Sequence, residues 1–213
     1  MAEISASTVM KLRKMSGQGM MDCKKALQEA DGDVDQAMEL LRKKGLATLA
    51  KRAARDTSEG TVVHWQSEDG KAAALATVCC ETDFVAKSDD FRALAETISA
   101  YIAACEADEG TEGILQTVVD GKSFQELLTE TVSKTGEKTE VGDYVRYKLD
   151  GAGLFGLYIH FNGKVGSLLQ IDASDDQVAG DDVLQQAASD IAMHITASKP
   201  LALDTDGLDP QTV

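Results

Sequence analysis

Residues 60–80 (GTVVHWQSEDGKAAALATVCC) mark the point where the hydrophobic pattern of this sequence changes from a helical spacing to a period of two. Two largely apolar segments, residues 61–66 and 72–80, flank a polar segment that ends in Gly70. Side chains point alternately to the two faces of a strand, and glycine is common in turns, so this stretch predicts a β-hairpin.

After the first hairpin, the pattern predicts two helices and a strand, at residues 88–107, 123–135 and 141–149. A second hairpin follows, at residues 157–161 and 164–171, joined by the turn dipeptide Asn162-Gly163. A last helix is predicted at residues 182–198, which stops before Pro200.

The second hairpin resembles the first, because residues 60–64 (GTVVH) and 156–160 (GLYIH) match in type. Each is followed by a turn, a strand, an acidic loop and a helix. This repetition indicates an internal duplication. The predicted fold class is therefore α+β, with two related subdomains of antiparallel hairpins and helices packed on one face.

The segment before residue 56 predicts a three-helix bundle. Val9, Leu12 and Met15 follow the spacing of one buried helix face, Asp33 offers an N-cap to the third helix, and Gly45 is expected to end that helix. A basic helical linker is predicted at residues 51–55. The predicted domains are residues 1–55, 56–150 and 151–213, the last one incomplete at its C-terminal end.

The charge is divided unequally along the chain. The net charge is −15, of which residues 1–55, with eleven Lys/Arg and seven Asp/Glu, contribute +4 and residues 56–213 contribute −19. Phosphate backbones repel such an acidic segment, so the sequence favours a protein partner and predicts no direct nucleic-acid binding. No apolar run is long enough to cross a bilayer, and we expect a cytoplasmic protein that contacts no membrane.

Motifs for catalysis, cofactors and metals have little support. Residues 151–156 (GAGLFG) fit a dinucleotide-binding glycine pattern, but a strand follows where that site needs a helix, so a flexible connection is the better interpretation. The four cysteines, Cys23, Cys79, Cys80 and Cys105, show no metal-ligand spacing and are expected to be reduced thiols. The sequence therefore predicts no catalytic residue, no cofactor and no metal.

Two local features point to a contact surface. Residues 81–85 (ETDFV) lie between a predicted strand and a predicted helix, so we expect a loop that either tucks Phe84 beneath itself or offers it to a partner. Composition alone favours the tucked ring. Met20 and Met21 are adjacent, and one helix face cannot bury both, so at least one is expected to be exposed, as in adaptable binding surfaces.

Three segments of this sequence resemble a known family. Residues 12–27 (LRKMSGQGMMDCKKAL) resemble the N-terminal signature of elongation factor Ts, and residues 80–87 (CETDFVAK) resemble its second signature. Residues 191–200 (IAMHITASKP) are similar to a third segment of that family. Cys79 stands where the family usually has Asn, a change that we expect to cost a hydrogen bond before Asp83.

The resemblance implies an exchange factor that binds the translation GTPase elongation factor Tu, releases its GDP and performs no covalent catalysis. It also implies a ubiquitin-associated type of bundle, whose Arg13, Met20 and Met21 would contact the nucleotide-binding domain of the GTPase. Asp83 and Phe84 of the second signature would approach the Mg²⁺ side of the nucleotide pocket, and the flanking Thr82 and Val85 would also belong to the partner-binding residues. His160 and the second hairpin would contact a more distant domain. Whether two copies associate in the complex is left open.

The end of the sequence suggests an interrupted element, since Asp209-Pro210 is a helix-opening signal followed by three residues. Together with the family's usual length, this predicts a C-terminally truncated chain. Two other functions remain open: an adaptor whose helical bundle binds a ubiquitin-like or other protein, and a thiol or dinucleotide enzyme. A pull-down that captures no GTPase would favour the adaptor.

Overall fold

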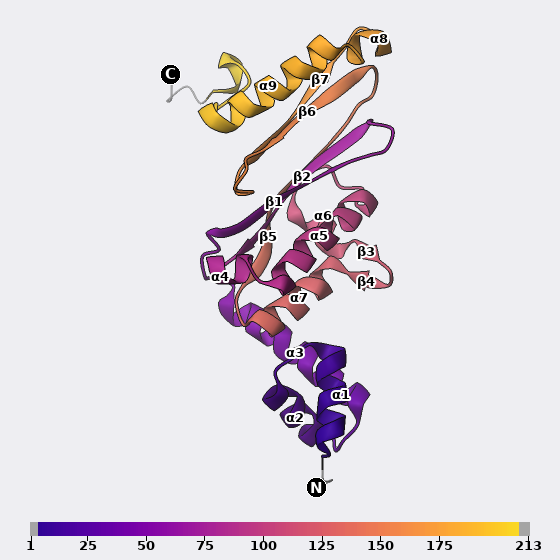
Figure 1. Cartoon of the computed structure of the whole chain (residues 1–213), viewed down its shortest axis with the longest axis vertical. Helices are drawn as coiled ribbons and strands as arrows, with labels where there is room; N and C mark the ends of the chain where they lie inside the picture. The colour runs from indigo at the N-terminus through magenta and orange to yellow at the C-terminus, as the bar shows by residue number, and fades with distance from the viewer. Residues whose placement is uncertain (1–3, 209–213) are drawn as a thin grey trace.

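The computed structural model describes residues 4–208 and has its main units arranged along one long axis (Figure 1). The N-terminal bundle lies at one end and consists of α1 (Ala6–Ser16), α2 (Met20–Glu29) and α3 (Val34–Arg52). Its core comprises small and aliphatic side chains, among them Leu12, Cys23, Leu27 and Ala37, all fully buried. Met15, predicted to join this core, is instead 54% exposed, because it lies in the last turn of α1.

Helix α3 is longer than the sequence predicted. Asp33 caps it as expected, its Oδ1 accepting the backbone N–H groups of Asp35 and Gln36, each at 2.9 Å. The helix does not end at Gly45 but continues to Arg52. Gly45 is the point where α3 packs against α7 (Phe124–Thr135), and a Cβ there would lie 3.1 Å from the carbonyl oxygen of Thr129. The glycine therefore allows a close helix contact and is not a stop.

The middle of the molecule is a three-stranded antiparallel sheet in the order β1-β2-β5. Its strands are β1 (Glu59–Gln66), β2 (Ala72–Cys80) and β5 (Thr139–Lys148), which confirms the first hairpin and the third strand. Helices α5 (Asp89–Ala104) and α7 cover one face (Figure 1). Side chains from both layers, including Val78, Phe91, Ile98 and Phe124, are at most 1% exposed and form the main core.

Three short elements between α5 and α7 were not predicted from the sequence. They are α6 (Thr111–Gln116), β3 (Val118–Val119) and β4 (Lys122–Ser123). Each is at most six residues long, too short for its hydrophobic pattern to repeat often enough to be recognised. They close the helix-covered side of the sheet near the end of α5.

The remaining unit consists of a second hairpin and a helix, as predicted. Strands β6 (Gly153–Ile159) and β7 (Gly166–Asp172) pair antiparallel, followed by α8 (Asp176–Ala179), α9 (Asp182–Ser198) and the short 3₁₀ helix η1 (Thr205–Gly207). The glycine-rich segment is not a flexible connection, because Gly153 and Gly156 belong to β6. Gly156 lets α9 approach the strand, since a Cβ there would overlap the carbonyl oxygen of Ala188.

The two hairpins lie one above the other, with α9 and the α5–α7 layer on opposite outer sides (Figure 1). A cleft of about 600 Å³, lined by residues such as Thr77, Tyr144 and Val165, lies between the sheets. At one end the β6–β7 turn is joined to β1 by a hydrogen bond from the Val62 N–H to the Gly163 carbonyl, 2.7 Å long. The second hairpin is thereby held against the first.

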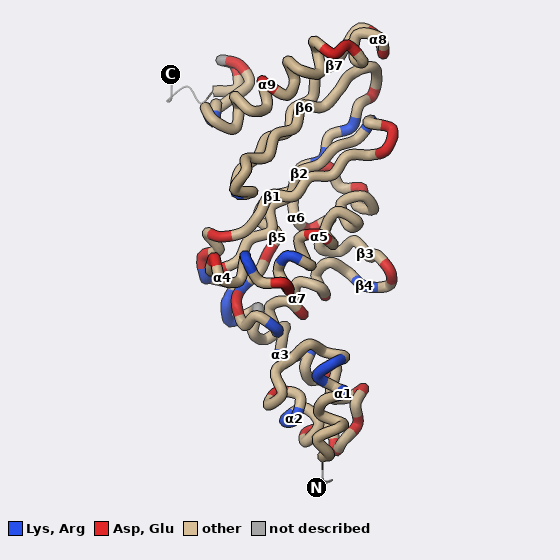
Figure 2. The backbone as a smooth tube through the Cα atoms, in the orientation of Figure 1, with Lys and Arg blue, Asp and Glu red and all other residues tan. Residues whose placement is uncertain are grey.

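Within residues 4–208, no helix combines the length and the apolar composition needed to span a bilayer. The predicted helix start at Asp209-Pro210 lies outside the described residues. Figure 2 shows that many of the acidic residues outside the bundle lie in turns and at helix ends.

Candidate functional site

Phe84 lies on the surface, at the junction between the central sheet and α5. The segment predicted as a loop is a single helical turn, α4 (Asp83–Ala86), placed directly after β2. The Phe84 side chain is 83% exposed, so the composition-based expectation of a tucked ring is wrong. Single exposed hydrophobic side chains are common on protein surfaces, so exposure alone does not mark a site. Phe84 is taken as the centre of the candidate site because it is exposed within the segment 80–87 that the sequence singled out.

The residues on either side of Phe84 are anchored inward. Val85 is 9% exposed and belongs to the main core. Thr82 is the N-cap of α4, and its Oγ1 accepts the Val85 N–H at 3.4 Å. Because Val85 fixes one side of this short turn in the core, Phe84 is directed away from it. The structure therefore gives Val85 a supporting position beneath Phe84, and its contact with a partner stays a prediction.

Thr82 is held by the turn that precedes β5. Its hydroxyl donates to Oε1 of Glu137 at 2.9 Å, and its N–H donates to Oε2 of the same carboxylate at 3.1 Å. Both donors of Thr82 are therefore used within the chain. Like Val85, Thr82 supports Phe84 within the chain, and its contact with a partner stays a prediction.

Glu81, immediately before Thr82, is the most strongly bound carboxylate of the site. It accepts hydrogen bonds from Arg52 at 2.9 Å, Arg55 at 2.8 Å and the Lys138 N–H at 2.6 Å. Burial opposes the ionisation of Glu81, but these donors outweigh it, led by the Lys138 amide and the two guanidinium groups, and lower its pKa to about 2. This cluster was not predictable from the sequence, because its members are far apart along the chain.

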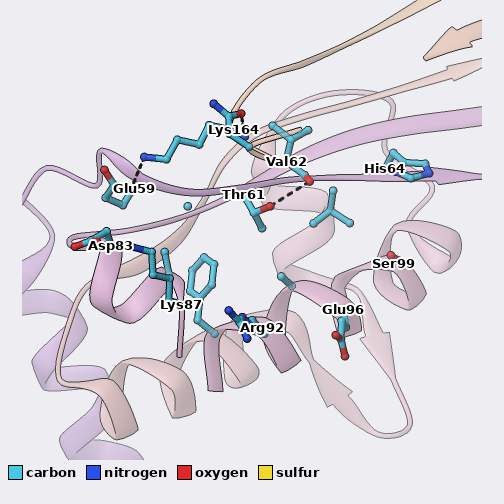
Figure 3. Close-up of a pocket in the computed structure, with 16 residues that line it drawn as sticks. Glu59, Thr61, Val62, His64, Asp83, Lys87, Arg92, Glu96, Ser99 and Lys164 are labelled. Carbon is cyan, nitrogen blue, oxygen red and sulfur yellow. Dashed lines mark hydrogen bonds and ion pairs between the residues drawn. The ribbon is translucent and has the colours of Figure 1, made fainter. Parts of the chain in front are cut away.

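Asp83 forms an ion pair with Lys87, 2.7 Å between Oδ2 and Nζ, one helical turn away. The hydrogen bond from Lys87 lowers the pKa of this carboxyl below its usual value. Asp83 and Lys87 lie at one end of an open groove of about 620 Å³, shown in Figure 3. At its other side lies Lys164 of the second hairpin, which pairs with Glu59 at 2.6 Å.

The predicted residues of the bundle are exposed, but they lie far from α4. Met20 and Met21, at the start of α2, are 46% and 64% exposed, which confirms that one helix face cannot bury both. Arg13 is exposed on the neighbouring helix α1. The bundle and α4 are joined through α3 (Figure 1). The structure therefore presents two separate candidate surfaces and not one pocket.

His160 lies at the tip of the second hairpin, where the structure adds a residue that the sequence analysis missed. Its Nδ1 is 3.2 Å from the hydroxyl oxygen of Tyr158, and its ring centroid is 4.3 Å from that of Phe161. Phe161 is 92% exposed. Its exposure could have been predicted, because Phe161 directly precedes the Asn162-Gly163 turn, and few other residues can cover a side chain at the end of a hairpin.

Thiol and metal chemistry gain no support from the geometry. Burial raises the pKa of the Cys80 thiol to about 11, with the charge of Glu137 acting in the same direction, and burial also raises the pKa of Cys79. Both thiols are therefore disfavoured as thiolate nucleophiles. Among the side chains of residues 4–208, no three of His, Cys, Asp or Glu come together as a metal site would require.

Comparison with known proteins identifies the family. The model of the family described as elongation factor TS matches residues 81–213. An elongation factor Ts of Nitratiruptor sp. is 40% identical over 99% of this chain and 68% of its own length. Those of Clostridium acetobutylicum and Cytophaga hutchinsonii are both 42% identical, over 97% and 100% of this chain and 66% and 74% of their own lengths.

This chain thus spans about two thirds to three quarters of the length of these relatives, and the similarity covers nearly all of it. The matched region of the family model includes α4 with Phe84, the Glu137 turn and the whole second hairpin. The chain belongs to the elongation factor Ts family.

Proposed function

We propose that this chain binds the translation GTPase elongation factor Tu and promotes release of its GDP, so that GTP can bind. The observation that carries the proposal is the 83% exposure of Phe84 on a turn whose neighbouring residues are anchored in the chain. A ring presented in this way needs little rearrangement to enter a partner. Preorganisation of this kind lowers the entropic cost of binding.

The proposed mechanism is mechanical. Tight GDP binding in such a GTPase depends on phosphate-binding backbone amides and on Mg²⁺, which requires nearly octahedral coordination. Inserting Phe84 beside the nucleotide pocket shifts the elements that hold the ion and so weakens GDP binding. No covalent step is needed, and the chain acts as an exchange factor.

Phe84 is not sufficient by itself. Burying a phenylalanine side chain contributes about 1.5 to 3 kcal/mol. A ten-thousandfold acceleration of GDP release requires roughly 5.5 kcal/mol of barrier reduction. The remaining energy must come from other contacts that also favour the open state of the GTPase. We assign these contacts to Arg13, Met20 and Met21 of the bundle, to Asp83, and to His160 of the second hairpin.

The test is the rate at which labelled GDP leaves elongation factor Tu, measured by stopped-flow fluorescence. The wild-type chain is expected to accelerate release, and Phe84→Ala is expected to lower the maximal rate by about tenfold or more, as expected if about 1.5 kcal/mol or more is lost. Val183→Ala is the control, because Val183 is 77% exposed on α9, outside the proposed contacts. Equal rates for Phe84→Ala and the wild type would remove the ring from the mechanism.

A further inference from the structure

Two turns that are distant in sequence hold each other through a reciprocal pair of carboxylates. Glu81 accepts the backbone N–H of Lys138 at 2.6 Å, and Glu137 accepts the backbone N–H of Thr82 at 3.1 Å. The Glu81 carboxylate thus binds the backbone amide of the residue after Glu137, and the Glu137 carboxylate binds the backbone amide of the residue after Glu81. The turn that leads into α4 is thereby fixed on the turn that leads into β5.

The C-terminal end of α3 joins the same cluster. Arg52, in the last turn of α3, and Arg55, just beyond it, bind the two different oxygens of Glu81. The ammonium group of Lys138 donates to the Arg55 carbonyl at 3.1 Å and pairs with Glu140 at 2.9 Å. The side chain of Glu81 is only 14% exposed, so these bonds are partly shielded from water.

Glu81 therefore connects the helix that comes from the bundle with the turn that carries Phe84. We propose that Glu81 is a positioning residue, which fixes the direction of Phe84 relative to the N-terminal bundle so that both reach one partner together. This inference rests on the proposed exchange function. Glu81 itself touches no reacting group and acts through α4.

Loss of the Glu81 carboxylate has a definite structural consequence. The Lys138 N–H would lose its acceptor, and Arg52 and Arg55 would lose the anion that holds them together. A partly buried polar group without a partner is costly, and so is an unpaired charge. The contacts of Thr82 with Glu137 and of Val85 with the core would remain. We therefore expect a looser turn on a folded protein.

A first experiment uses the free protein and needs no GTPase. Hydrogen exchange of the Lys138 amide is measured by NMR in the wild type, Glu81→Ala, Glu81→Gln and the control Asp108→Asn, whose carboxylate pairs with Lys148 elsewhere. We expect about tenfold or faster exchange in Glu81→Ala, as for an amide that loses its bond. Glu81→Gln keeps an acceptor oxygen, so the exchange rate of its Lys138 amide should lie between the rates in the wild type and in Glu81→Ala. Unchanged exchange in Glu81→Ala would overturn the inference.

A second experiment is a double-mutant cycle with Phe84→Ala, read as labelled-GDP release at increasing concentrations of this protein. In the wild-type background, Glu81→Ala should lower the maximal rate by about tenfold and change the half-saturating concentration by less than about twofold. In the Phe84→Ala background it should change the rate by less than about twofold. Glu81→Gln should restore part of the loss.

The cycle separates positioning from general damage. An equal loss in both backgrounds would show that Glu81 does not act through Phe84, and the inference would be wrong. If the wild-type chain fails to accelerate GDP release, the proposed function itself fails. The amide-exchange result then decides by itself whether Glu81 holds the turn.

Discussion

Phe84 and Phe91 lie seven residues apart and have opposite environments. Phe91 is 1% exposed, on the face of α5 that packs against the sheet, whereas Phe84 is 83% exposed on α4. Hydrophobicity is the same for both, so the difference comes from the backbone around them. Thr82 and Val85 fix the turn from both sides, and the ring between them has no core position available.

Because the pKa of Glu81 is low, its contribution to the free energy of unfolding should depend on pH. Its folded-state pKa is about 2, compared with an ordinary value of 4.5, because the Lys138 amide, Arg55 and Arg52 outweigh the effect of burial. The charges that surround it are Arg52, Arg55, Lys138, Glu137 and Glu140. A carboxylate with a lowered pKa stabilises the fold above its unfolded-state pKa and loses this contribution as the pH falls toward the folded value.

We therefore compare the free energies of unfolding of the wild type and Glu81→Gln in urea at several pH values. The wild type should be more stable at pH 7, and the difference should shrink steadily between about pH 5 and pH 3, because glutamine does not titrate. A difference that stays constant down to pH 3 would contradict the assignment of the lowered pKa to Glu81.

Among the elements of residues 4–208, the sequence predicted the helices of ten or more residues and the strands of seven or more. Both hairpins, the strand at β5, and helices α5, α7 and α9 were found where the pattern placed them, within a few residues. The errors at three glycines share one cause, since at each of them packing overruled the residue's local preference. The sequence predicted that Gly45 ends a helix and that Gly153 and Gly156 belong to a flexible connection. All three instead lie inside a helix or a strand, at points where a neighbouring segment packs closely against them.

The candidate site was predictable only in part. The exposed methionines followed from their adjacency, and Phe84 was singled out by its position between two elements. Glu81 and Glu137 were not predictable as a pair, because their relation depends on two turns that meet only in the folded chain. Local sequence carries no record of such a contact.

The start of α2 offers a test of the bundle as a contact surface. Met20→Asp combined with Met21→Asp places two charges at exposed positions in the first turn of a helix, where the helix dipole favours acidic residues, so the bundle should remain folded. We expect the affinity for elongation factor Tu to fall by about tenfold or more, as for central apolar contacts. Titration calorimetry measures it.

Met10→Asp is the matched control for this pair, because Met10 is 63% exposed on α1 and is not among the proposed contacts. Circular dichroism should show the same helix content in all variants. Full affinity in the double variant would mean that α2 does not bind the GTPase.

The contact between α9 and β6 can be tested without any partner. Gly156→Ala adds a methyl group that overlaps the Ala188 carbonyl oxygen and lies 2.9 Å from its carbon. Overpacking of this kind costs about 1 to 3 kcal/mol. We expect faster amide exchange throughout α9 and a lower unfolding midpoint in urea. Gly151→Ala is the control, since among the described residues 4–208 no neighbouring atom beyond the adjoining residues lies within 4 Å of its added methyl group. Equal stability of the two variants would contradict this packing.

At the scale of the whole molecule, the proposed contacts are distributed along the long axis, from the bundle through α4 to the second hairpin (Figure 1). A partner that touches all of them must match their spacing. If the proposed function holds, this arrangement should favour one particular conformation of the GTPase, because a ligand shifts an equilibrium only through a difference in affinity.

Energetic coupling between two ligands is reciprocal. If this chain lowers the affinity of the GTPase for GDP by some factor, GDP must lower the affinity of the GTPase for this chain by the same factor. We expect elongation factor Tu saturated with GDP to bind at least about 100-fold more weakly than the nucleotide-free form, at the upper end of common couplings. Surface plasmon resonance with both forms measures the ratio. Equal affinities would exclude exchange by this route while leaving simple association intact.

The hydrogen bond from Val62 to Gly163 also occupies a backbone N–H group on the edge strand of the central sheet. Strand β1 is an outermost strand, and unpaired backbone groups on such strands can recruit other chains into fibrils. Gly163 occupies one of these groups on β1, and residues 108–110 occupy others on β5, through the bonds from Arg146 to Asp108 and from Gly110 to Tyr144. The tip of the second hairpin thus covers part of the β1 edge, and we expect a shortened hairpin to leave the Val62 N–H free to pair with another chain.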